Sequence, residues 1–141
     1  MENKEKVFAE LEVELAEILS ELDMAPESHR DFGWLQEVIL MAVRDPATWK
    51  SQYAEYIGKR ANITCERIRQ ILYKAVWNNW KADSGEIIKN HFGDNVQMKF
   101  EYVKPNHVEF IKLIADNLRE KYQIQPERVS LSKIILATTF K

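Results

Sequence analysis

Residues 63–75 read ITCERIRQILYKA, and their apolar side chains recur every three or four positions, as on one face of a helix. The predicted buried face consists of Ile68, Ile71, Leu72 and Ala75. The predicted outer face is polar with a net positive charge, and it consists of Glu66, Arg67, Arg69, Gln70, Tyr73 and Lys74. Thr64 is a suitable N-cap, and the helix is expected to end near Asn79.

The segment before this helix predicts a partner helix. Asp45 is a suitable N-cap with Pro46 at the first helical position, so a helix is expected from 46 to about 59. Its expected core face consists of Trp49, Tyr53, Tyr56 and Ile57. A break of about four residues, 60–63, separates the two helices. Together they predict a helix-turn-helix over about 46–79.

The rest of the chain predicts an all-α multi-helix bundle around this motif. Further helices are expected at about 33–44, at 84–92 before Gly93, and from the capping-box start at Asn106 to about Tyr122. Residues 96–102 alternate apolar and polar side chains, which favours one arm of a short β-hairpin or wing near 96–103. Residues 123–141 are a C-terminal extension without an assigned structure.

An amphipathic helix is predicted over 3–23, before a linker at 25–31 and the main domain at 32–122. Its apolar stripe consists of Phe8, Leu11, Leu15, Ile18 and Leu22. Two interpretations stay open. The helix either packs on its own domain, or it is a dimerisation or partner-binding helix, which would make the protein a homodimer.

The charge is distributed unevenly. The whole chain has a formal net charge of −2, but residues 1–31 contain ten acidic and three basic side chains. Residues 50–81 contain seven basic and two acidic side chains, a local basic patch that favours a polyanionic partner. The acidic segment would either shield this patch or pair with a basic partner.

Several classes of protein are disfavoured by the composition. No apolar run approaches the roughly 20 residues that span a bilayer, and the first residues lack a signal-peptide pattern, so we expect a cytoplasmic protein without a membrane partner. The single cysteine, Cys65, agrees with a reducing compartment. We find no metal-ligand spacing, phosphate-binding glycine loop or nucleophile motif, and therefore expect neither a cofactor nor an enzyme.

Two resemblances add to this interpretation. Residues 57–75, IGKRANITCERIRQILYKA, resemble the region of bacterial primary sigma factors that reads the −35 promoter element. Over about 25–122, the segments MAPESHRDFGWLQEVILMAVRDP, NITCERIRQILYKAVWNNW, HFG and KPNHVEFIKLIADNLR resemble the C-terminal effector domain of the master response regulator of sporulation in Firmicutes. This resemblance implies a six-helix DNA-binding domain whose fourth helix enters the major groove. Arg69 and Gln70 stand where that regulator has glutamate and then arginine, which implies a different DNA sequence.

We therefore expect a sequence-specific transcription regulator that binds double-stranded DNA. The predicted base-reading residues are Glu66, Arg69, Gln70 and Lys74, because Arg pairs with guanine and Gln with adenine in the major groove. The predicted phosphate-binding residues are Lys50, Lys59, Arg60, Arg67 and Lys81. Tyr73 or Trp77 is expected to touch a DNA backbone or a partner. The alternative is a protein-interaction module or antagonist, derived from a helix-turn-helix domain, that binds a paralogous regulator or RNA polymerase.

Overall fold

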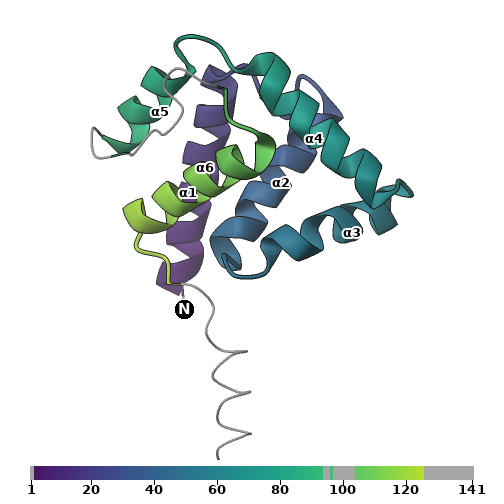
Figure 1. Ribbon diagram of the computed structural model, residues 1–141. Coiled ribbons are helices and arrows are strands. Elements are labelled where there is room, and N and C mark those ends of the chain that lie inside the picture. Colours follow the sequence, from purple (N-terminus) through teal and green to yellow (C-terminus); the bar gives the residue numbers. More distant parts are fainter. Residues whose placement is uncertain (1, 94–95, 97–103, 126–141) are drawn as a thin grey trace, which may run out of the picture.

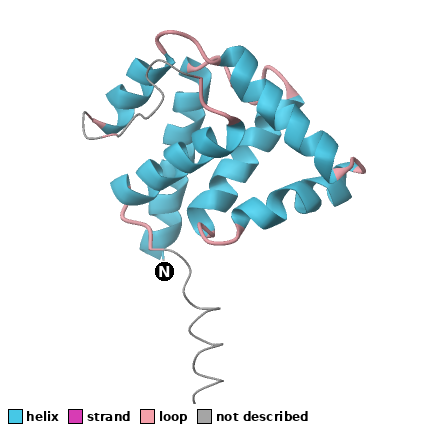
Figure 2. Ribbon diagram, in the orientation of Figure 1, coloured by secondary structure: helices cyan, strands magenta, loops and turns pink. Residues whose placement is uncertain are grey.

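The computed structural model describes residues 2–93, 96 and 104–125, and within these ranges it contains helices and no strand (Figures 1 and 2). The helices are α1 (Glu2–Glu21), α2 (Arg30–Arg44), α3 (Trp49–Ala61), α4 (Cys65–Asn79), α5 (Ser84–Phe92) and α6 (His107–Lys121). The predicted all-α class is confirmed. The predicted hairpin near 96–103 lies outside the described residues except for Val96, which is buried and not part of a strand. Residues 126–141 of the C-terminal extension also lie outside them.

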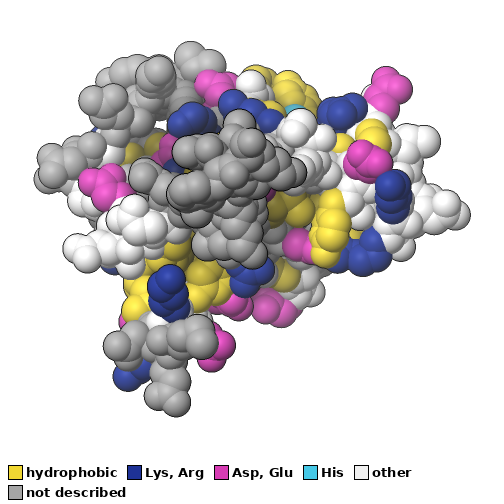
Figure 3. Space-filling view, turned by 90° about the horizontal axis from the view of Figure 1, so that it is seen from below, with side chains coloured by type: hydrophobic (Ala, Val, Ile, Leu, Met, Phe, Trp, Pro, Cys, Tyr) yellow, Lys and Arg dark blue, Asp and Glu magenta, His cyan; other side chains and the backbone are white. Residues whose placement is uncertain are grey.

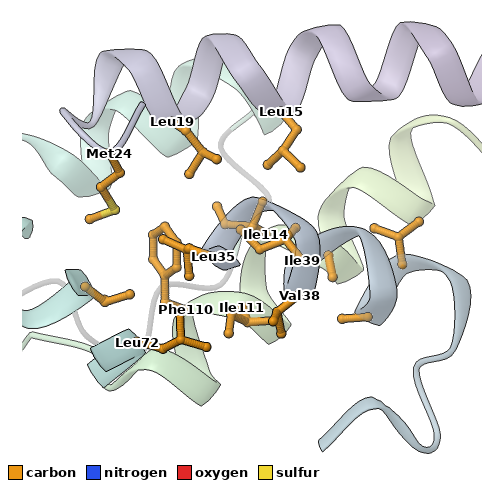
Figure 4. Packing of buried hydrophobic residues seen from close by; sticks show 14 of the residues in the cluster. Leu15, Leu19, Met24, Leu35, Val38, Ile39, Leu72, Phe110, Ile111 and Ile114 are labelled. Carbon is orange, nitrogen blue, oxygen red and sulfur yellow. The ribbon is translucent and has the colours of Figure 1, made fainter. Parts of the chain in front are cut away.

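Helices α2 and α6 pack against each other at the centre of the molecule. They contribute the side chains that fill the middle of the core: Leu35, Val38, Ile39, Phe110, Ile111 and Ile114 (Figure 4). Helix α1 covers one side of this pair, and the α3–α4 unit packs on α2 and, through α4, on α6. Within the described residues, no helix is both long enough and apolar enough to cross a bilayer.

Helix α1 is part of this core. Leu11, Leu15, Ile18 and Leu22 are at most 1% exposed, and Figure 4 shows Leu15 pointing from α1 toward the α2–α6 centre. Phe8 packs against the edge of the core, with the Arg44 guanidinium 4.3 Å from its ring centroid. Of the two interpretations left open for this helix, the structure supports packing on its own domain, because the apolar stripe predicted for a dimer or partner helix is covered by the chain itself. The described residues of α1 therefore share one core with α2 and α6.

A buried polar cluster also ties α1 to the rest of the fold. Glu14 is only 8% exposed, and its carboxylate accepts hydrogen bonds from Lys121 Nζ at 2.6 Å and Tyr122 Oη at 2.5 Å. His91 Nδ1 lies 2.9 Å from the same carboxylate, while His91 Nε2 lies 2.6 Å from Glu21. The cluster therefore joins α1 to α5 and to the C-terminal end of α6.

Protonation in this cluster follows from its contacts. Burial alone would raise the pKa of Glu14, but the hydrogen bonds from Lys121, Tyr122 and His91 outweigh it and lower that pKa. Burial alone would lower the pKa of His91, but the hydrogen bonds with Glu14 and Glu21 outweigh it and raise that pKa. Burial and the Glu14 carboxylate raise the pKa of Tyr122 to about 12.

Three predicted details of α2 and α3 were wrong. Helix α2 begins at Arg30 rather than at about 33, because the His29 side chain accepts a hydrogen bond from the Asp31 amide. Helix α3 begins at Trp49 after a turn at 46–48, rather than at Pro46. Its predicted core residue Tyr56 is 52% exposed, with the Arg60 guanidinium over its ring. The predicted capping box of α6 between Asn106 and Glu109 is confirmed.

Candidate nucleic-acid interface

A three-residue turn joins α3 to α4. Asn62 ends α3 in the left-handed conformation with φ = 59°, which asparagine tolerates better than most residues. Gly58 allows the close return of the chain, because a Cβ atom there would lie 2.5 Å from the Ile63 carbonyl oxygen. Thr64 then caps α4, and its hydroxyl accepts a hydrogen bond from the Arg67 amide at 3.2 Å. This is a helix-turn-helix connection with the predicted second helix.

The inner face of α4 is anchored as predicted. Ile68, Leu72 and Val76 are fully buried, and Ile71 and Ala75 are at most 9% exposed. α4 packs against α2, α3 and α6. Its opposite face is therefore held in a fixed orientation toward solvent.

The four predicted base-reading residues lie together on that outer face. Glu66, Arg69, Gln70 and Lys74 are all exposed, and they follow one another within three turns of α4. None of the four forms an ion pair with any residue in the described part of the chain. Their side chains are thus accessible to solvent and to a partner, and among them Arg69 also lies beside the Tyr53 hydroxyl.

The predicted phosphate-binding residues divide into two groups. Three of them have a carboxylate partner: Lys59 pairs with Glu55 at 2.9 Å, Arg60 donates two 2.6 Å hydrogen bonds to Glu37, and Lys81 pairs with Asp23. In each case the hydrogen bond to the carboxylate is the main cause that raises the pKa of the basic group. Lys50 and Arg67 are exposed and form no ion pair with a described residue.

The pairs of Lys59 and Arg60 reduce the positive field near the α3–α4 turn, and the pair of Lys81 reduces it beyond the C-terminal end of α4. Basic and acidic side chains lie next to one another on the right of Figure 3, the side on which Figure 1 shows the α3–α4 turn. Exposed ion pairs of this kind contribute about 0–1 kcal/mol each, so a phosphate can replace the carboxylate at small cost. The sequence-derived basic patch is nevertheless weaker than its count of lysines and arginines indicates.

One flank of α4 faces the start of α6. Tyr53 Oη lies 2.9 Å from His107 Nε2, and the His107 ring also lies edge-on to Tyr73, with 6.3 Å between the centroids. Burial and, secondly, the positive charge of Arg69 lower the pKa of His107, which is therefore neutral at pH 7. Burial raises the pKa of Tyr53, although the Arg69 guanidinium opposes this. Arg69 thus lies at the edge of an aromatic cluster shared by α3, α4 and α6.

The same flank contains a residue that the sequence analysis missed. Lys104 Nζ donates a hydrogen bond to the backbone carbonyl of Trp77 at 3.2 Å and lies 5.1 Å from the centroid of its indole ring. Trp77 in turn stacks on Tyr73, with 5.6 Å between the centroids and 14° between the planes. Tyr73 and Trp77 are 40% and 37% exposed. Lys104 is 27 residues beyond Trp77, and no local pattern in the sequence connects the two.

The opposite flank of α4 faces the start of α2. Arg67 and Lys74 line a shallow hollow there together with His29, Asp31 and Phe32. The Asp31 carboxylate also lies 3.9 Å from Arg30 Nε, so acidic and basic side chains are mixed on this flank.

The acidic helix α1 does not cover the outer face of α4. It packs against α2 and α5, and Figure 1 shows it on the other side of the molecule from the α3–α4 turn. Within the described residues, the acidic segment 1–31 approaches the predicted DNA-contacting residues in two places. Asp23 pairs with Lys81, and Asp31, at the start of α2, lines the hollow shared with Arg67 and Lys74. The structure thus does not support shielding of the base-reading residues by α1.

No protein-family model matches the chain, and no solved structure shows a significant match to it.

Proposed function

We propose that the protein is a sequence-specific transcription regulator that binds double-stranded DNA with α4 in the major groove. The observation that carries this proposal is the outer face of α4. Glu66, Arg69, Gln70 and Lys74 are exposed there, and none of them forms an ion pair with a residue that the structure describes. They lie on a helix that follows a three-residue turn and is anchored by a buried apolar face. A major groove about 12 Å wide admits a helix of this kind.

The chemistry of these side chains suits base reading. The Arg69 guanidinium matches the O6 and N7 acceptors of guanine, and the Gln70 amide matches the N6 and N7 groups of adenine. Glu66 is able to accept a hydrogen bond from the N4 amino group of cytosine. The likeness of residues 25–122 to the effector domain of the sporulation regulator supports the same orientation, with the different pair at 69 and 70 implying a different operator.

Binding in this mode depends on salt and on exchange of ion pairs. Lys50 and Arg67 are available for phosphates, whereas Lys59, Arg60 and Lys81 would each exchange a carboxylate for a phosphate. Each phosphate that is neutralised contributes about 0.9 to the slope of log affinity against log salt concentration. Because three of the five predicted phosphate-binding residues already have a carboxylate partner, we expect the slope of log affinity against log salt concentration to be shallower than five unpaired basic residues would give.

The proposal is tested by selecting bound duplexes from a random DNA pool at about 100–150 mM salt, where non-specific binding is weak. The expected result is an enriched motif, and its symmetry would report how many copies bind. Recovery of unenriched DNA, or of none, would contradict the proposal.

A second candidate function is a protein-interaction module that binds RNA polymerase or a paralogous regulator. The observation that favours it is the neutralisation of Lys59, Arg60 and Lys81, together with the exposed aromatic pair Tyr73 and Trp77. Under this alternative, RNA polymerase or the paralogue would bind the purified protein in the absence of DNA. Substitution of Trp77 would weaken that complex more than substitution of Gln70.

A further inference from the structure

We propose that Lys104, held against Trp77, is a phosphate-binding residue that contacts the DNA backbone beside α4. This inference rests on the proposed function and extends it to a residue outside the helix-turn-helix. It concerns the flank of α4 that carries Arg69 and Tyr73 and that faces His107 at the start of α6.

Lys104 is held in a defined position. Its ammonium group is fixed by the hydrogen bond to the Trp77 carbonyl and by its place over the indole ring. The ring is supported by its stacking on Tyr73. A lysine held in this way loses less side-chain entropy on binding than one that moves freely in solvent, and the two remaining N–H groups are free to donate.

The position also suits a backbone contact. A helix in the major groove has a phosphate backbone on each side, so residues that flank it are placed to contact phosphates rather than bases. Lys104 has no carboxylate partner within the described residues, in contrast to Lys59, Arg60 and Lys81. It therefore offers a full positive charge on this flank without the loss of an ion pair.

The aromatic pair adds hydrogen-bond donors to the same flank. The indole N–H of Trp77 and the hydroxyl of Tyr73 donate to no described residue, and both side chains are more than one-third exposed. Neutral donors of this type contact phosphate oxygens together with lysine in protein–DNA complexes.

A purely structural role for Lys104 is the competing explanation. The Trp77 carbonyl lies in the last turn of α4, and its usual helical donor, the Lys81 amide, donates instead to Ser84 Oγ at 2.8 Å. Lys104 would then only satisfy this carbonyl and interact with the C-terminal end of the helix dipole. Such a role affects the stability of the fold but not the number of counterions released on DNA binding.

The two explanations are separated by comparing Lys104→Gln with Lys112→Gln. Glutamine at 104 removes the charge but keeps a donor for the Trp77 carbonyl. Lys112 is an exposed residue of α6 that pairs with Asp116, so its substitution makes the same change in net charge without removing a contact to Trp77. Affinities are measured between 50 and 300 mM salt, for the enriched duplex and for a scrambled one, and melting temperatures are recorded for both variants.

We expect Lys104→Gln to bind both duplexes about 5- to 20-fold more weakly at 100 mM salt and to lower the salt slope by about 1. Lys112→Gln should leave the slope unchanged. Equal slopes for the two variants would overturn the inference, and a lower melting temperature with an unchanged slope would assign Lys104 a structural role only. If the unsubstituted protein binds no duplex at all, the proposed function fails before this comparison is reached.

Discussion

Replacement of Glu14 by glutamine should lower the free energy of unfolding by about 2–3 kcal/mol. Glu14 is the polar residue through which α1 contacts both α5 and the end of α6, and its carboxylate is almost inaccessible to water. Glutamine has nearly the same volume, so the substitution removes the charge without creating a cavity. The experiment therefore measures the polar attachment of α1 separately from its apolar packing.

The magnitude follows from the three hydrogen bonds to the Glu14 carboxylate. A hydrogen bond to a charged group contributes about 1.5–3 kcal/mol, but not all of this is lost. The amide oxygen of glutamine still accepts from Tyr122, and Lys121, whose side chain is 42% exposed, regains hydration. His91 keeps its contact with Glu21. The uncompensated loss is thus close to one charged hydrogen bond.

Urea denaturation and thermal unfolding followed by circular dichroism would measure the change. At roughly 3–4 °C for each kcal/mol in a domain of this size, the midpoint should fall by about 6–12 °C. Glu12→Gln is the matched control, because Glu12 is exposed on the same helix and the change in charge is identical. Equal stability of the two variants would refute the view that this cluster attaches α1 to the fold.

Two further changes test other parts of the structure. Gly58→Ala should lower the free energy of unfolding by about 1–3 kcal/mol despite the higher helix propensity of alanine, because the alanine Cβ would collide with the Ile63 carbonyl oxygen. Urea denaturation would measure the change, and unchanged stability would contradict the close approach of the chain at this turn. The fold raises the pKa of His91 above its value in the unfolded chain, which is about 6.5. Protonated His91 therefore stabilises the fold fully below about pH 6.5, and this stabilisation is lost as the pH rises through the pKa of His91 in the folded protein. Stability measured from pH 5 to 9 should therefore fall over the upper part of this range, and His91→Gln should flatten the decline; equal pH profiles for the two proteins would exclude His91 as its source.

The local structure of α4 could be predicted because it depends on nearby residues. Thr64 caps the helix through the amide of Arg67, three positions away, and the apolar residues recur with the period of one helix. The same was true of the capping box between Asn106 and Glu109. Short-range signals of this kind need no knowledge of the fold.

The role of α1 could not be decided from its sequence. An apolar stripe such as Leu11, Leu15 and Ile18 has the same spacing whether it packs on its own domain or on a second chain. What distinguishes the two is the partner surface, which here is formed by α2 and by the polar contacts of Glu14 with residues more than 70 positions away. The exposed position of Tyr56 was missed because its spacing from Trp49 and Tyr53 fits the buried face, although it lies at the edge of that face beside Arg60.

The candidate site was only partly predictable for a related reason. The sequence identifies which residues are basic, but their partners lie far along the chain, as Glu37 does from Arg60 and Asp23 does from Lys81. These pairs depend on how α2 and the loop after α1 pack near the helix-turn-helix. The position of Lys104 over Trp77 likewise depends on the packing of α6 against α4.

The central claim, that α4 reads bases, is tested most directly by repeating the duplex selection with a Gln70→Ala variant. The account predicts that the unsubstituted protein enriches a motif and that the variant enriches the same motif with lost preference at about one base pair, corresponding to about 1–3 kcal/mol at that position. An identical motif from both proteins would show that Gln70 does not read DNA. Absence of any motif from the unsubstituted protein would contradict the claim altogether.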